Sequence, residues 1–576
     1  MFTSIKLIFS ILDLKTKQQL FFIFILIFLK SFLDATGIGL IFPLIASFSN
    51  PETILSNPMF FEINDKFIKN DKKLLVYYLC IFVLIFFILK NTFNLIISFY
   101  INKITFLKRA DLSTATFSKY LHAPFDYYLK KNTSELSSNL IYEVGRFYQF
   151  IFNLINLCNH ILFSFIIIII LILTDWRIVF YALTGIGTIS FLTIYFLGNT
   201  SKKLGDEIST TQIHIVNTIK EAFNSIAETK IYNVHEYFIN NFYKSHFNNA
   251  KANWIQLTLS GIPHLIFEIF AISFFCIFAI FILNSNNDLN SYLPLLGLFA
   301  VALVRLIPSI TSGLKCYQDL RFTSSGVSKV YSDIKNTPSE VIKDIKNPNK
   351  TSKDVIKISN LSFGFKNKSL IDNFNIEINQ GETIGVYGES GSGKTTLINL
   401  ILGLLTPTKG KIFFNNQDIR EISYTWRKKI GYVGQNYTIL NSNIVENIAF
   451  GNEDLKNIEK KLLVDSLIEA ELKEFIGEDN NVTSKKVGEN GNNLSGGQKQ
   501  RLVLARALYK KPEILILDEF TSSLDEKNED LIINEILSKK NKKIIIIISH
   551  KLKVVNKCDR LVNFNEGKMF IKNNLK

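Results

Sequence analysis

The chain has 576 residues and a mass of 66.0 kDa, which is too long for one ordinary domain and predicts at least two folding units. Apolar residues make up 47% of the chain and charged residues 20%, a balance that excludes an intrinsically disordered protein. The net charge of +15 suits an anionic partner, and the five cysteines form no CxxC pair, which argues against a disulfide framework or a zinc site.

Apolar stretches long enough to cross a membrane as helices fill the first part of the chain. Between Arg146 and Asp175 lie 28 residues without a formal charge. As a helix they would extend about 42 Å, beyond the ~30 Å hydrocarbon core. Another 24 uncharged residues separate Arg177 from Lys202, so the two stretches form a transmembrane hairpin. The six predicted helices occupy residues 20–48, 74–101, 148–173, 178–200, 261–283 and 292–314.

The connections between these helices predict their orientation. The long connections at residues 102–147 and 200–253 are rich in lysine and arginine, which places them on the cytoplasmic side. Residues 49–72, on the opposite side, also hold three lysines and run against this rule. Within them, residues 57–69 are either a short external amphipathic helix or a loop. Six spans leave both termini in the cytoplasm, and the first apolar run is too long for a signal-peptide core.

A phosphate loop is predicted in the polar second half. The short apolar strand at residues 383–387 leads directly into GESGSGKT and then into a helical pattern. Glycines let backbone N–H groups wrap an anion, the lysine meets the β- and γ-phosphates, and the threonine hydroxyl reaches Mg²⁺. The pattern predicts a nucleoside triphosphate site. Its candidate residues are Gly388, Glu389, Ser390, Gly391, Ser392, Gly393, Lys394, Thr395 and Thr396.

Two further apolar strands end in polar residues. Residues 514–517 deliver Asp518 and Glu519 at the edge where open α/β sheets place ligands. One carboxylate can hold the metal, and the other can orient or deprotonate water. The five isoleucines at 544–548 form another buried strand, which ends beside the phosphate site at His550. Taken alone, an acidic pair can simply cap a strand, and a lone histidine is usually structural.

The sequence LSGGQ at residues 494–498 opens another helix. A serine hydroxyl and glycine N–H groups at a helix N-terminus form a second anion site, here Ser495, Gly496, Gly497 and Gln498. Because the chain already has a phosphate loop, we expect this second site to face the nucleotide of another copy. With this motif the chain resembles the ATP-binding-cassette transporters over essentially its whole length.

The resemblance implies an all-α, six-helix transmembrane domain of the exporter type, fused to an α/β P-loop nucleotide-binding domain. The expected boundaries are 1–335 for the first domain, 336–350 for a linker and 351–576 for the second. It also implies an ATPase that uses ATP and Mg²⁺. A single cassette with six spans resembles half a transporter, so we expect a homodimer, with a heterodimer as the alternative.

The resemblance also assigns roles to individual residues. Phe365 is expected to stack on adenine, at a position where tyrosine is commoner in the family. Gln435 matches the family's glutamine that senses Mg²⁺ and the attacking water, although glycine precedes it where proline is usual. Glu519 is the expected general base, assisted by Gln435 and His550. The expected metal ligands are Thr395, Gln435 and Asp518. Residues 124–135 and 225–233 resemble coupling segments, with surface amphipathic helices as the alternative.

Cations inside the membrane half are candidate ligands for cargo. Lys90 and Arg305 lie within predicted spans, where an unpaired charge is costly. His264, which lies in the predicted span 261–283, is a further candidate. Alternatively, Lys90 snorkels to the interface and Arg305 pairs with Glu268.

Short strings in the spans, such as GIPHLIFE, are similar to bacterial flippases of lipid-linked oligosaccharides. That similarity implies a multi-pass protein of the bacterial cytoplasmic membrane with an anionic lipid as cargo. An exporter of peptides or hydrophobic small molecules, or an ATP-gated channel, remains as an alternative. The membrane half argues against a nucleic-acid partner, despite the positive charge.

Overall fold

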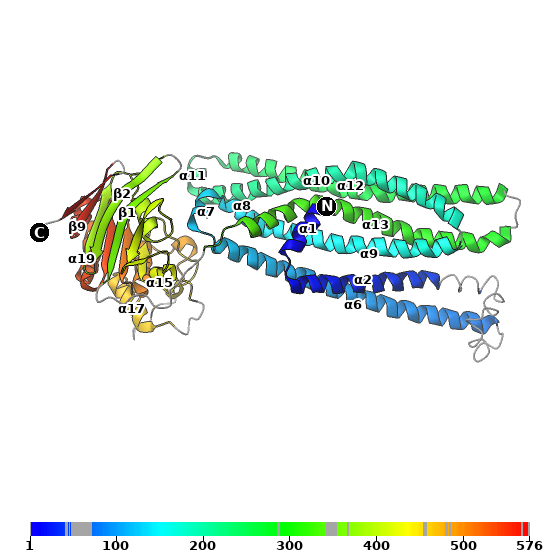
Figure 1. Ribbon diagram of the computed structural model, residues 1–576, viewed down its shortest axis with the longest axis horizontal. Coiled ribbons are helices and arrows are strands. Elements are labelled where there is room, and N and C mark those ends of the chain that lie inside the picture. Colours follow the sequence, from blue (N-terminus) through cyan, green and yellow to red (C-terminus); the bar gives the residue numbers. More distant parts are fainter. Residues whose placement is uncertain are drawn as a thin grey trace. The chain divides into compact units, whose positions relative to one another are not determined.

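The computed structural model divides the chain into two compact units (Figure 1). The first comprises Met1–Ala123 and Tyr127–Ser339, and the second comprises Pro124–Asp126 and Glu340–Lys576. The structure describes residues 2–40, 44, 47, 72–174, 176–284, 289–340, 354–365, 368–452, 458–477, 482, 485–565 and 568–573. The predicted external segment at residues 57–69 lies outside these ranges.

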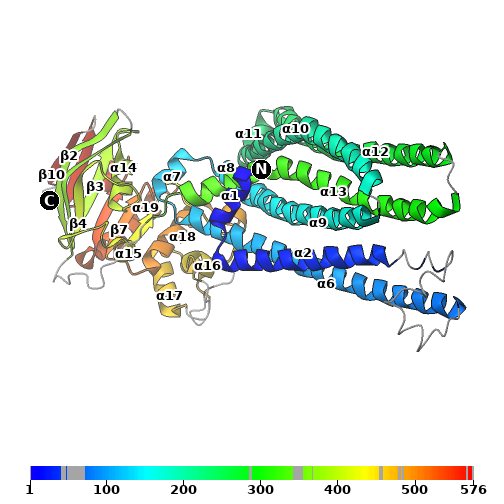
Figure 2. The same ribbon diagram turned by 45° about the vertical axis from the view of Figure 1, so that its right-hand side comes forward.

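Long helices build the first unit. In chain order they are α1 (Phe2–Ile11), α2 (Leu14–Gly39), α6 (Lys72–Leu121), α9 (Val144–Thr174), α10 (Trp176–Asn224), α12 (His235–Asn284) and α13 (Leu289–Asn336). Helices α2 and α6 run side by side, and α9 lies along α13 (Figure 2). Searched over the described residues, the chain has 5 helices long and apolar enough to cross a membrane.

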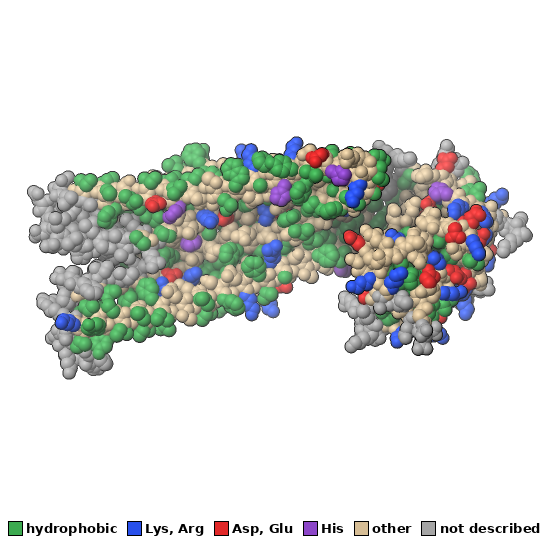
Figure 3. All heavy atoms as spheres, turned by 180° about the vertical axis from the view of Figure 1, so that it is seen from behind, with side chains coloured by type: hydrophobic (Ala, Val, Ile, Leu, Met, Phe, Trp, Pro, Cys, Tyr) green, Lys and Arg blue, Asp and Glu red, His purple; other side chains and the backbone are tan. Residues whose placement is uncertain are grey.

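The outer surface of these helices is apolar. On α6, for example, Phe82, Ile85 and Leu89 are all at least half exposed. Figure 3 shows hydrophobic side chains spread along the long helices, while charged side chains crowd the surface of the second unit. Leucine and phenylalanine exposed over such lengths are expected where lipid, not water, surrounds a helix. The chain is therefore a multi-pass membrane protein.

The helices extend far beyond the predicted spans, so describing residues 102–147 and 200–253 as connections was wrong in detail. Helix α6 continues to Leu121, α10 continues to Asn224, and α12 already begins at His235. The apolar-run criterion detects only the segment in hydrocarbon, whereas backbone hydrogen bonding and packing continue the helix into polar sequence. The short helices α7 (Phe125–Lys130) and α11 (Ile226–Ile231) lie inside the two predicted coupling segments. Helix α2 ends at Gly39, and most of the rest of the predicted span, up to residue 48, lies outside the described residues.

A buried charge cluster ties three of the long helices together. A short helix, α8 (Thr133–Ser138), passes through a π-helical turn, η3 (Asn139–Glu143), into α9. Glu143 is fully buried and pairs with Arg146 at 3.4 Å and with Lys329 of α13 at 3.6 Å. The hydroxyl of Ser209 in α10 also donates to Glu143. Since buried charges are stable only when paired, this cluster fixes the packing of α9, α10 and α13.

Two sheets form the frame of the second unit. The larger has the order β10-β9-β3-β8-β7-β6. Its strands are β3 (Thr383–Gly388), β6 (Ile430–Val433), β7 (Ile514–Asp518), β8 (Ile544–Ile548), β9 (Arg560–Asn565) and β10 (Lys568–Asn573). All neighbouring pairs are parallel except β9 and β10. The five isoleucines of β8 are all buried, as the uninterrupted apolar run predicts for a strand covered on both faces.

The smaller sheet is antiparallel and has the order β2-β1-β4-β5. It contains β1 (Val355–Phe365), β2 (Lys368–Asn379), β4 (Lys409–Phe414) and β5 (Gln417–Asp418). The helices of this unit include α14 (Lys394–Ile401), α15 (Ser423–Lys428), α16 (Ile444–Ile448), α17 (Lys460–Glu469), α18 (Gly496–Tyr509), α19 (Glu526–Ser538) and α20 (Leu552–Val555). The second unit is thus an α/β domain, and the prediction of a helical region fused to an α/β domain is confirmed.

Candidate functional site

The phosphate loop joins β3 to α14, as the sequence predicts. Gly393, the residue that caps α14, has a left-handed φ of +110°, which side chains other than glycine rarely adopt. A Cβ atom on Gly388 would lie 2.5 Å from the carbonyl oxygen of Phe564 in β9, so a larger residue cannot fit there. The backbone conformation of the phosphate loop therefore requires glycine at both positions.

Lys394 occupies the inside of this loop. Its side chain is 6% exposed, and its ammonium donates to the carbonyl oxygens of Gly388 at 2.8 Å and Glu389 at 2.7 Å. Burial lowers the pKa of Lys394, while the charges of Glu519 and Asp518 act in the opposite direction. The loop is thus already curled around a cation, which is the arrangement that a phosphate group requires.

Asp518 ends β7 at the same sheet edge and is 3% exposed. Its Oδ2 atom is buried and has no hydrogen-bond partner among the described residues. Burial raises the pKa of Asp518 to about 6, and the charge of Glu519 adds to this effect. A buried carboxylate oxygen without a partner suits a hard cation, since Mg²⁺ prefers oxygen ligands. Thr395 and Gln435, the other predicted ligands, offer a hydroxyl and an amide oxygen.

Replacing Asp518 with asparagine is expected to stabilise the nucleotide-free protein by about 1–3 kcal/mol at neutral pH, because the substitution removes a desolvated charge. The pKa of Asp518 is higher in the folded protein, about 6, than its ordinary value of 3.8. The difference in the free energy of unfolding between the D518N variant and the wild type should therefore decrease as the pH falls below 6 and disappear near pH 4. Thermal unfolding without nucleotide or Mg²⁺ measures it, with the exposed Asp465→Asn as control. A D518N midpoint below that of the wild type would contradict the assignment.

Glu519 is held between two other predicted catalytic residues. Its Oε2 accepts a hydrogen bond of 2.7 Å from Nε2 of Gln435, which follows β6, and its Oε1 lies 2.7 Å from Nε2 of His550, which follows β8. Glu519 also has a left-handed φ of +49°, a strained conformation of the kind that collects at functional sites. The structure therefore brings Gln435, Glu519 and His550 together, and their catalytic roles stay a prediction.

The LSGGQ segment begins α18 with a complete capping box. The Ser495 hydroxyl accepts from the Gln498 amide at 3.2 Å, and the Gln498 side chain accepts from the Ser495 amide at 2.9 Å. This cap fixes the first turn of the helix. Ser495 and Gly496 are exposed, so the helix start presents its N–H groups and positive dipole end to the surface.

One residue of this region escaped the sequence analysis. Gln500, in the first half of α18, is 4% exposed. Its side chain donates to the Ser522 hydroxyl at 2.9 Å and accepts from the Ser523 amide at 3.1 Å. It therefore links α18 to the loop that follows Glu519. Gln500 is the second glutamine in the run GGQKQR, and its place next to the LSGGQ motif could have drawn attention to it. Nothing in the sequence identifies the partners of its side chain.

Of the predicted cargo residues, the structure describes the side chains of Lys90 and His264, and these two do not line the same cavity. Lys90 in α6 is 9% exposed and pairs with Asp34 of α2 at 3.0 Å, so it does not extend freely toward an interface. His264 in α12 is exposed and is not among the described residues that line the cavity beside Lys90. The side chains of Arg305 and Phe365 lie outside the described residues, although both positions are placed on elements, α13 and the end of β1.

Comparison with known families covers both units. The model of the ABC transporter transmembrane region matches residues 20–306, and the model described as ABC transporter matches residues 371–522. The chain belongs to the ABC transporters. This ABC transporter carries one helical membrane unit and one ATP-binding unit on the same chain. It is therefore an ATPase and binds ATP.

Individual relatives show how far this transporter resembles known ones. The ATP-dependent lipid A-core flippase of Francisella novicida is 25% identical over 476 residues, covering 81% of this chain and 78% of the flippase. The alpha-hemolysin translocation ATP-binding protein HlyB of Escherichia coli is 38% identical, but over 37% of this chain and 30% of HlyB. The structure of a bacterial Atm1-family ABC exporter with ATP bound superimposes with a TM-score of 0.77 at 17% identity. It covers 96% of this chain, which supports the exporter fold.

Proposed function

We propose that the transporter works as a homodimer that binds two ATP molecules between its copies. Each ATP would lie between the phosphate loop around Lys394 of one copy and the residues Ser495, Gly496 and Gly497 of the other. One observation carries this proposal. The start of α18 is a capped, exposed helix N-terminus suited to an anion, in a chain that already has a complete phosphate loop of its own.

The residues around Glu519 support hydrolysis at this site. Glu519 is positioned to accept a proton from an attacking water, and its hydrogen bonds to Gln435 and His550 fix its orientation. Lys394 would balance charge on the phosphates. Mg²⁺, held by Thr395, Gln435 and Asp518, would neutralise phosphate charge when bound. The unpartnered Oδ2 of Asp518 supports its role as one of the ligands.

ATP binding and hydrolysis would then drive the membrane helices between two states. We place the transmission in α7 and α11, within the segments predicted for coupling. In this proposal the ATP-binding unit and both termini face the bacterial cytoplasm, in agreement with the basic segments after the spans.

The proposed cargo is an anionic lipid, with a lipid-linked oligosaccharide as the specific expectation. The lipid A-core flippase supports a lipid cargo, because its similarity extends over 81% of this chain, whereas that to HlyB extends over 37%. A membrane exporter of peptides or hydrophobic small molecules, and an ATP-gated channel, are the outcomes that the experiment must separate.

Reconstitution into liposomes tests the proposed function. Purified full-length protein should hydrolyse ATP and move a fluorescent polyisoprenyl diphosphate sugar between leaflets only when Mg²⁺ and ATP are supplied. The Glu519→Gln protein, in the same liposomes, serves as the control without turnover. ATP-dependent ion conductance without lipid movement would identify a channel. ATP hydrolysis stimulated by a peptide, without any lipid movement, would identify a peptide exporter.

A further inference from the structure

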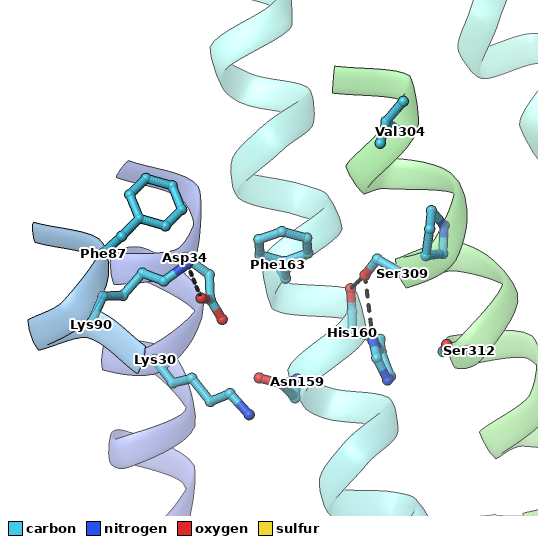
Figure 4. A pocket seen from close by; sticks show the side chains of 11 residues that line it. Lys30, Asp34, Phe87, Lys90, Asn159, His160, Phe163, Val304, Ser309 and Ser312 are labelled. Carbon is cyan, nitrogen blue, oxygen red and sulfur yellow. Dashed lines mark hydrogen bonds and ion pairs between the residues drawn. The ribbon is translucent and has the colours of Figure 1, made fainter. Parts of the chain in front are cut away.

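A polar cavity of about 320 Å³ lies among the membrane helices of the first unit (Figure 4). Helices α2, α6, α9 and α13 supply its walls. Its charged and hydrogen-bonding residues are Lys30, Asp34, Lys90, Asn159, His160, Ser309 and Ser312. Polar groups inside a membrane-spanning region are costly and mark a site that binds something polar.

Lys90 and Asp34 neutralise each other in this cavity. Their ion pair of 3.0 Å is completed by Asn94, whose Nδ2 donates to the same carboxylate at 2.9 Å. The Lys90 ammonium also lies 4.7 Å from the centre of the Phe87 ring, within cation–π range. The carboxylate and the ammonium are thus both occupied, and together they add no net charge.

Lys30 supplies the uncompensated charge. It lies on α2 one helical turn before Asp34 and is half-buried. Its side chain points from α2 toward Asn159 of α9 (Figure 4). Among the residues that the structure describes, no carboxylate forms an ion pair with Lys30. The described lining therefore carries one net positive charge within an apolar span.

Two neighbours of Lys30 can add hydrogen bonds to a bound anion. The Asn159 Oδ1 accepts from Ser31 at 3.3 Å, which leaves the amide nitrogen as a donor. Ser309 lies 3.5 Å from Nδ1 of His160, so Nε2 is the other polar atom that the ring offers. Apart from the polar residues, the described lining is apolar and consists of Phe87, Phe163, Val304 and Pro308. A cation and donors beside apolar walls fit an amphiphile that has an anionic head.

We propose that this cavity binds the phosphate group of a membrane lipid and that Lys30, not Lys90, is the cation that recognises it. The inference rests on the proposed function, since it names the recognising residue and the headgroup class of the cargo. Lysine is a suitable partner for phosphate because its ammonium is a compact charge with three donors.

The test uses full-length protein in dioleoylphosphatidylcholine liposomes with rising amounts of dioleoylphosphatidic acid as probe. ATPase stimulation is measured relative to each variant's own rate without probe. Lys30→Ala and Lys30→Gln should each raise the half-maximal phosphatidic acid fraction about tenfold or more, because a charge-assisted hydrogen bond is lost. Lys30→Arg should restore most of the response. Lys15→Ala, an exposed lysine on the same helix, is the matched control and should respond like the wild type.

Changes to the neighbouring pair should act differently. Asp34→Asn frees the Lys90 charge and should lower the half-maximal fraction, whereas the double variant Asp34→Asn with Lys90→Ala should resemble the wild type. Soluble glycerol 3-phosphate should not stimulate; if it did so as well as the lipid, the assignment to a lipid headgroup would be overturned.

Different results would contradict the proposed function, the role of Lys30 and the headgroup class. Wild-type protein that hydrolyses no ATP would overturn the proposed function itself. Wild-type protein that responds to phosphatidic acid, together with Lys30 variants that respond equally well, would overturn the role of Lys30 alone. Stimulation by an uncharged hydrophobic compound but not by phosphatidic acid would overturn the headgroup class.

Discussion

Replacing Glu519 with glutamine is expected to slow ATP hydrolysis by about 10²–10⁴-fold while ATP binding persists. The amide cannot accept the proton of the attacking water. It can still accept the hydrogen bond that Gln435 now donates to Glu519, so the shape of the site is kept. Steady-state ATPase rates and the amount of ATP retained per chain after rapid desalting measure the two effects. The retained nucleotide should be ATP, not ADP, in a closed dimer.

The exposed Glu526→Gln, seven positions further along the chain, is the matched control and should hydrolyse ATP at close to the wild-type rate. Normal turnover by the Glu519 variant would remove Glu519 from the role of general base. His550 would then be the next candidate, because it is the other titratable group in contact with Glu519.

A large loss of stability is expected when Glu143, which lies far in the sequence from the phosphate loop, is replaced. Replacing it with alanine leaves Arg146, 10% exposed, and the Lys329 ammonium without their carboxylate. Arg146 keeps its hydrogen bond to the Gly205 carbonyl oxygen at 2.9 Å, which does not compensate its charge. Breaking a buried ion pair typically costs about 3–5 kcal/mol. The midpoint of thermal unfolding in detergent should therefore fall sharply.

Two comparisons separate this effect from general fragility. Ser209→Ala removes one hydrogen bond to Glu143 and should cost only about 1 kcal/mol. Glu207→Gln removes an exposed carboxylate from the same helix, α10, and should leave the midpoint unchanged. If the Glu143→Ala and Glu207→Gln proteins had the same midpoint of thermal unfolding, the buried charge cluster would not stabilise the packing of α9, α10 and α13.

The arrangement of the candidate ATP site could be predicted from the sequence because its residues follow local rules. The phosphate loop is contiguous in sequence, and its strand and helix appear where the motif requires them. Asp518 ends one apolar strand and His550 follows the neighbouring one, and parallel strands that end at one edge bring such residues together. The hydrogen bond between Gln435 and Glu519 does not follow from such rules, because only the family resemblance pointed to Gln435.

The membrane unit could be predicted only in outline. Hydropathy finds the segments that lie in lipid, but it does not tell where a helix ends in water, which is why α6 and α10 extend so far beyond their predicted spans. Charge partners also depend on the register between helices. Lys90 looked like a free cation because Asp34, its partner, lies on a different helix, and sequence spacing does not fix that register.

The most direct test of the shared ATP sites uses mixed dimers of two differently tagged copies, both carrying Glu519→Gln so that ATP is retained. Lys394→Ala disables a phosphate loop. Ser495→Asp keeps a helix cap but places a negative charge against the γ-phosphate. With the two changes on different copies, one site is intact and one ATP per dimer should be retained; with both changes on the same copy, none should be. One ATP when both changes share a copy, and none when they are separated, would show that each chain uses its own Ser495 and would contradict the account.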